Sequence, residues 1–141
     1  MSVFRVISGL ASAIVFSAGA SVANAGVFYE CDLNTRIVNG WVSPKMGFVF
    51  DDNGQVTVID GVILSVVGAP LKASVRRKGN MNRIRWSIAG ATDSRGQRIA
   101  TFRYVADLNR ATGAVHVVAK PGLAAQRWAA KGTCKTRVPE K

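Results

Sequence analysis

The chain has 141 residues and a formal net charge of +11, from 19 lysine and arginine residues against 8 aspartate and glutamate residues. This length suits one domain with a single hydrophobic core. With one histidine and two cysteines the chain lacks the ligands of a metal cluster, and it contains neither a Gly-x-Ser-x-Gly nucleophile motif nor a phosphate-binding glycine loop. The composition therefore predicts a protein that is not an enzyme and has no cofactor.

The first 25 residues have the features of a cleavable secretory signal. A positively charged N-terminal end precedes an uncharged apolar stretch from Val6 to Ala20, and Ala23 and Ala25 match the small-residue cleavage pattern before Gly26. The alternative is an uncleaved membrane anchor. It is disfavoured because a spanning helix needs about 20 predominantly apolar residues, and serine and glycine dilute this stretch. We therefore expect a periplasmic or secreted protein with no transmembrane span after cleavage.

Export makes a disulfide the expected state of Cys31 and Cys134, which lie near the two ends of the mature chain. Free thiols and a metal site are the alternatives, and no neighbouring histidine supports the latter. Cys31 falls in the first predicted strand, residues 27–32. In the chain-entropy model, closing a loop of about 100 residues stabilises the fold by about 4–5 kcal/mol.

Alternating apolar and polar residues predict a first hairpin over residues 46–58. A three-residue loop at 52–54 places Phe50 opposite Val56, whereas a two-residue loop would place it opposite Thr57. The three-residue loop is preferred because it keeps the large apolar side chains on one face and gives Gly54 the positive φ of the turn. The acidic pair in this turn, Asp51 and Asp52, is interpreted as a solvated turn rather than as a catalytic pair.

A second hairpin over residues 71–88 carries the strongest concentration of positive charge. A four-residue loop at 78–81 pairs Val75 with Ile84 inside and sets Arg76 opposite Arg83 outside. Like charges directly opposite one another destabilise a sheet unless they splay into water or an anion lies across them. Arginine binds phosphate and carboxylate oxygens in pairs, so the hairpin is a candidate anion-binding site. Its candidate residues are Lys72, Arg76, Arg77, Lys78, Arg83 and Arg85.

The remaining segments are predicted with less uniform signals. Residues 61–70 are apolar and glycine-bounded, and periodicity does not decide between strand, loop and helix. A loop at 110–113 sets His116 opposite Asp107 on the outer face, as a surface pair rather than a catalytic one. The other predicted elements are a long strand at 97–108, the longest of the chain, a strand at 115–119, one helical turn within 123–130 and a last strand at 132–134.

These elements predict an all-β fold: a small up-and-down antiparallel β-barrel of eight or nine strands, lipocalin-like in outline, with an open β-sandwich as second choice. The domain is expected to span residues 26–136, with a flexible tail at 137–141. Aromatic side chains of the interior are candidates for an apolar ligand pocket, although barrels of this size are more often filled by side chains. These candidates are Phe48, Phe50, Trp86, Phe102 and Tyr104.

Several short motifs resemble those of a family of small exported proteobacterial proteins without an assigned activity. They are Tyr29-Glu30-Cys31, Trp41, Val56-x-Val58-x-Asp60, Pro70-x-x-Ala73-x-Val75, Arg83-x-x-Trp86 and Gly132-Thr133-Cys134. The resemblance implies a compact periplasmic β-domain and no particular functional residues. A looser resemblance is to periplasmic inhibitors of C-type lysozymes, but those enzymes are cationic and would repel a protein of this charge.

The charge distribution ranks the functional hypotheses. From Lys72 to Arg110 there are ten basic residues against Asp93 and Asp107. A field of this sign attracts anions, and export makes nucleic acid an unexpected partner. The first hypothesis is binding of an anionic envelope lipid, glycan or acidic protein, with peripheral membrane contact. The alternatives are an apolar-ligand carrier that uses the barrel interior and, third, an inhibitor of a cell-wall enzyme.

Overall fold

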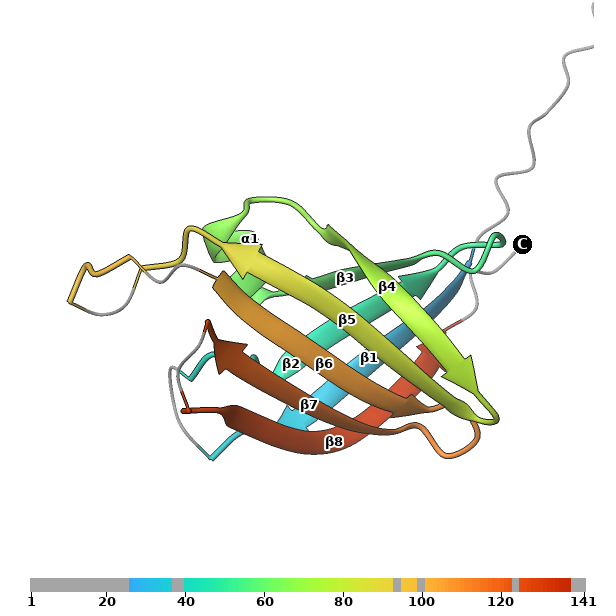
Figure 1. Ribbon diagram of the computed structural model, residues 1–141. Coiled ribbons are helices and arrows are strands. Elements are labelled where there is room, and N and C mark those ends of the chain that lie inside the picture. Colours follow the sequence, from blue (N-terminus) through green and yellow to red (C-terminus); the bar gives the residue numbers. More distant parts are fainter. Residues whose placement is uncertain (1–25, 37–39, 93–94, 99–100, 123–124, 138–141) are drawn as a thin grey trace, which may run out of the picture.

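The computed structural model describes residues 26–36, 40–92, 95–98, 101–122 and 125–137. Eight antiparallel strands form a closed barrel in which each strand pairs with the next and the last pairs with the first, as predicted (Figure 1). The predicted signal at 1–25 and residues 138–141 lie outside the described residues. The strands are β1 Val27–Asn34, β2 Lys45–Phe50, β3 Val56–Asp60, β4 Leu71–Lys78, β5 Met81–Ala89, β6 Thr101–Asn109, β7 Ala114–Pro121 and β8 Trp128–Arg137.

The registers of both predicted hairpins are confirmed. Phe50 pairs with Val56 across a three-residue turn in which Gly54 has a φ of 76°. In the second hairpin Val75 pairs with Ile84 as expected, but the loop is shorter than predicted. Lys78 and Met81 are themselves paired, which leaves a two-residue turn and extends both strands toward the end of the barrel.

The segment that periodicity left undecided begins with a short helix, α1 Gly61–Val66. Its position follows from Asp60, whose carboxylate Oδ1 accepts a hydrogen bond of 2.7 Å from the Ile63 amide and caps the first turn. Ile63 is fully buried against the barrel core. The helix therefore replaces sheet pairing between β3 and β4, which share only three residue pairs.

The structure corrects the bounds of three segments. The strand predicted from residue 97 begins at Thr101, while Arg98 forms an isolated bridge with Thr92. The longest strand of the described residues is β8 rather than the predicted one. It begins inside the segment predicted as a helical turn, since Trp128 to Ala130 pair with β7. It also includes Arg137, the predicted first residue of the tail, whose guanidinium lies 2.7 Å from the Glu30 carboxylate.

The barrel has two ends that differ in how they are covered. At the helix end, which carries α1, the Trp41 ring stacks on Phe102 at 4.2 Å and its carbonyl accepts a 2.9 Å hydrogen bond from the Tyr104 hydroxyl. At the opposite end lie the turns at 51–55, 79–80 and 110–113, which we call the hairpin end (Figure 1).

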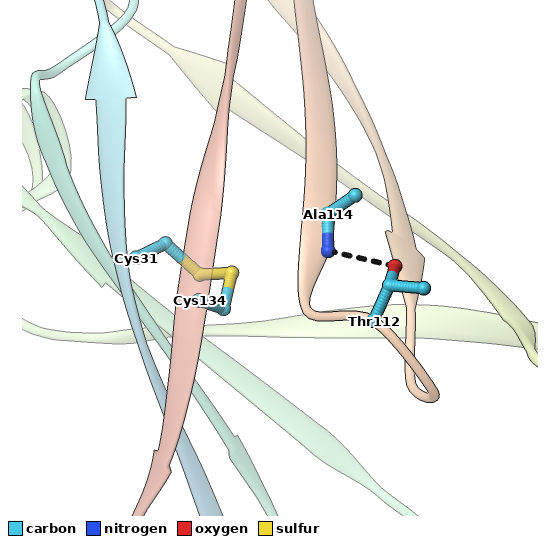
Figure 2. Close-up of a disulfide and its surroundings, with 4 residues drawn as sticks. All are labelled: Cys31, Thr112, Ala114 and Cys134. Atoms are coloured by element: carbon cyan, nitrogen blue, oxygen red, sulfur yellow. Dashed lines mark hydrogen bonds between the residues drawn. A yellow bond between two sulfur atoms is a disulfide. The ribbon is translucent and has the colours of Figure 1, made fainter.

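The predicted disulfide is present and ties the first strand to the last. Cys31 and Cys134 occupy directly opposite positions of the β1–β8 ladder (Figure 2). The β6–β7 turn packs against this position, where the Cys134 amide donates a 2.7 Å hydrogen bond to the Gly113 carbonyl. A Cβ at Gly113 would lie 2.5 Å from the Cys134 carbonyl oxygen, so the close approach requires glycine.

Candidate functional site

The candidate site begins with the outer face of β4 to β7, four neighbouring strands of the barrel (Figure 1). Alternation along each strand buries one set of side chains and exposes the other. Most of the predicted anion-binding residues are exposed together in this way. We call this surface the basic face and define it by Lys72, Arg76, Arg83, Arg85, Arg103 and Lys120.

Two members of the basic face, Arg103 and Lys120, were missed by the sequence-based prediction. They are directly opposite each other in the β6–β7 ladder, and Arg103 is opposite Ser87 on β5. The signal that could have found them is the predicted 110–113 loop, because the register that sets Asp107 opposite His116 also sets Arg103 opposite Lys120. The positive surface therefore extends beyond the hairpin.

Arg83 differs from its neighbours because it has an acidic partner. Its Nε lies 2.7 Å from Asp107 Oδ1 and its Nη2 lies 3.1 Å from Oδ2, which is a two-point contact. The Asp107 carboxylate raises the pKa of the Arg83 guanidinium above its ordinary value. Asp107 does sit opposite His116 as predicted, but its carboxylate is engaged by arginine from the other side. Arg83 is thus the neutralised member of the basic face.

Arg77 is separated from the basic face, although the prediction grouped it there. It is opposite Asn82, which is buried inside the barrel, and its guanidinium lies over the Phe50 ring at 5.9 Å. Because the turn is two residues long, Arg77 stays in the strand and belongs to the inner face at the hairpin end. Lys78 remains exposed at the tip.

The five aromatic residues proposed to line an apolar pocket are all buried in the barrel interior. Trp86 stacks on Tyr104 with ring centroids 5.1 Å apart, and Phe48 meets Trp86 edge to face at 5.9 Å. Phe102 lies 6.1 Å from Tyr104. These rings pack against one another and form much of the core.

Three buried polar atoms have no hydrogen-bond partner among the described residues: Asp60 Oδ2, Asn82 Oδ1 and Trp86 Nε1. Burial raises the pKa of the Asp60 carboxyl above its ordinary value, against hydrogen bonds from Ile63 and Ser43 that lower it. Asp60 has a structural task as the cap of α1. Asn82, in contrast, lines a pocket of about 380 Å³ at the hairpin end.

A second groove, of about 700 Å³, lies where β8 begins beside the end of β1. It combines the apolar side chains of Val42 and Trp128 with the cations Arg36, Arg127 and Lys131. The groove is therefore positively charged, like the basic face. Within the described parts of the chain, no group of three or more histidine, cysteine or acidic residues is placed to hold a metal ion.

The described residues include no helix that is both long and apolar enough to cross a membrane. Comparisons with protein-family models, with curated proteins and with solved structures found no match to this chain. The resemblances noted from the sequence therefore remain predictions, and the hypotheses of function rest on the surface and pockets described above.

Proposed function

We propose that this is an exported, non-enzymatic protein whose basic face binds an anionic component of the cell envelope. One observation carries the proposal. The four strands β4 to β7 contain a single acidic residue, Asp107, and that residue already neutralises Arg83. The disulfide supports an oxidising compartment, because such bonds persist mainly outside the cytosol.

The unpaired arginines explain why an anion would bind here rather than elsewhere. Arg76, Arg85 and Arg103 are exposed and form no ion pair with any residue that the structure describes. Arg103 faces Lys120 across the ladder, which places like charges opposite one another, whereas Arg83, which faces Arg76, is already paired with Asp107. A bound phosphate or carboxylate group would relieve this repulsion and accept paired hydrogen bonds from the guanidinium forks.

Binding of the disulfide-bonded protein to vesicles tests the proposal. We expect binding to vesicles that contain anionic phospholipid and not to neutral ones, with an affinity that falls as salt is added. A parallel titration with an acidic polysaccharide distinguishes a glycan partner from a lipid partner. Equal binding to anionic and neutral vesicles, or no binding to either anionic probe at low salt, would contradict the proposal.

Two matched variants locate the binding surface. Replacing Arg76, Arg85 and Arg103 with glutamine should reduce binding by about tenfold or more, which corresponds to about 1.4 kcal/mol. The control replaces three exposed cations on other strands, Lys45, Lys135 and Arg137. Both variants lose the same charge, so equal loss of binding would indicate attraction by net charge alone rather than a site.

The packing of the interior does not favour the carrier hypothesis. Rings that contact one another at 5–6 Å occupy the space in which an apolar ligand would lie. We therefore place the binding function on the outer surface.

A further inference from the structure

The pocket at the hairpin end is built from both inner-face strand residues and turn residues. It has a volume of about 380 Å³, within the range of about 300–1,000 Å³ that is typical of small-molecule sites. Its aromatic wall consists of Tyr29 and Phe50, whose rings meet edge to face at 5.5 Å. The predicted cleavage point lies directly before Gly26, another lining residue, so cleavage would add an α-ammonium group at the rim.

Asn82 breaks the apolar pattern of the barrel interior at this pocket. The other inward positions of β5 are Ile84, Trp86 and Ile88, whereas Asn82 is polar and only 1 % exposed. Its carbonyl oxygen accepts no hydrogen bond from any described residue. A buried acceptor without a donor destabilises the fold, and such exceptions to the apolar pattern of an interior concentrate at functional sites. Asn82 lines the pocket, so a ligand bound there is placed beside this unpartnered oxygen.

Arg77 lies beside Asn82 and carries a positive charge that no described acidic residue neutralises. It is the cross-strand partner of Asn82 and has no ion-pair partner among the residues described. The guanidinium is placed by the Phe50 ring beneath it and by the turn, since a Cβ on Gly54 would lie 3.4 Å from its Nη2. Arg77 therefore offers a pre-positioned cation to an anion in the pocket.

The rest of the rim supplies further polar contacts of both signs. The Arg110 guanidinium donates to the Gly79 carbonyl and lines the pocket with its charge. Asp51 accepts a 2.8 Å hydrogen bond from the Gln55 amide as part of the turn, and Asp52 is exposed. Carboxylates at the rim accept hydrogen bonds from hydroxyl groups and disfavour a ligand that is only an anion.

We propose that the pocket at the hairpin end binds a small hydroxylated carboxylate, such as a uronic acid, with the carboxylate on Arg77 and a neighbouring hydroxyl on Asn82. A hydroxyl suits Asn82 because it can donate to the amide carbonyl and accept from the amide nitrogen. The aromatic wall packs against the carbon skeleton. This site is separate from the basic face, so it goes beyond the proposed function and does not depend on it.

Nuclear magnetic resonance titration of the disulfide-bonded protein with glucuronate tests the inference. We expect saturable shifts of the Asn82 side-chain amide and the Arg77 Nε signal. Glucose, which has hydroxyls without the carboxylate, and acetate, which has the carboxylate without hydroxyls, should each bind about tenfold more weakly or worse. Equal shifts with acetate, or no saturable shift with glucuronate, would overturn the proposal.

Two variants separate binding from folding. Asn82→Leu replaces an unpartnered polar group with an apolar one, so it should abolish glucuronate binding without lowering the melting temperature. Arg77→Gln alters an exposed side chain and should weaken binding about tenfold in a folded protein. Retained binding in both variants would refute the assigned contacts. Both should bind anionic vesicles like the unmodified protein, which distinguishes failure here from failure of the proposed function.

Discussion

The two sides of the barrel's outer surface differ in how far their charges are balanced. On the side formed by β8, β1 and β2, two of the four strand cations have acidic partners: Lys45 lies 2.9 Å from Asp32, and Arg137 lies 2.7 Å from Glu30. On the basic face, Arg83 has such a partner in Asp107, whereas Arg76, Arg85 and Arg103 have none among the described residues. The first side also contains the disulfide.

This difference indicates a division of tasks between the two sides. The β8–β1–β2 side closes the barrel through seven β1–β8 residue pairs and the Cys31–Cys134 bond. The basic face adjoins the β3–β4 ladder, which has only three residue pairs. Its unbalanced positive charge lowers stability and favours association with anions. Stability and binding should therefore respond to different substitutions.

The largest expected effect is on the closing side. Replacing Cys31 and Cys134 with serine should lower the free energy of unfolding by about 4–5 kcal/mol, because the unfolded chain regains the entropy of a long loop. Denaturant unfolding measures this change. Under conditions where the variant is still folded, its vesicle binding should be unchanged. A loss of vesicle binding in the folded variant would contradict the separation of stability from binding.

The second-largest effect is expected from two substitutions that give arginines of the basic face acidic partners. Ser74 and Ser87 are exposed and lie opposite Arg85 and Arg103, so Ser74→Glu with Ser87→Glu supplies each arginine with a cross-strand carboxylate. We expect vesicle affinity to fall about tenfold or more, with stability raised by about 0.2–1 kcal/mol per pair. The glutamine double variant is the control. Undiminished binding in the glutamate variant would place the site elsewhere.

A smaller effect concerns α1, the helix in the connection between β3 and β4. Burial raises the pKa of Asp60 in the folded protein, so folding favours its protonated form. Its contribution to stability is therefore greatest below its unfolded pKa and is lost as pH rises through the raised folded value. Asp60→Asn keeps the cap and has no proton to lose, so unfolding measured across pH should lack this decline. Identical pH profiles would show that Asp60 titrates normally.

The smallest expected effect is at Asp107. Asp107→Asn removes the single acid of β4 to β7 and leaves Arg83 facing Arg76, and the free energy of unfolding should change little because exposed ion pairs contribute little to stability. Vesicle binding should strengthen, and its dependence on salt should become steeper. Weaker binding in this variant would mean that Asp107 helps to position Arg83 for the ligand.

The sequence by itself determined the barrel, its hairpin registers and its disulfide. Phe50 opposite Val56 and Val75 opposite Ile84 follow from short turns and two-residue alternation, which act over a few residues. The pairing of Cys31 with Cys134 follows because the chain has two cysteines and the first and last strands of a closed barrel meet.

Only the tertiary structure decided which charges are free. Arg83 meets Asp107 through the register of β5 against β6, and the connection at 90–100 is too long for local turn chemistry to fix that register. Arg77 faces the hairpin end because the turn is two residues long, and Asn82 becomes a buried acceptor only when the barrel closes around it. Long-range pairing sets these positions, so alternation along a single strand could not reveal them.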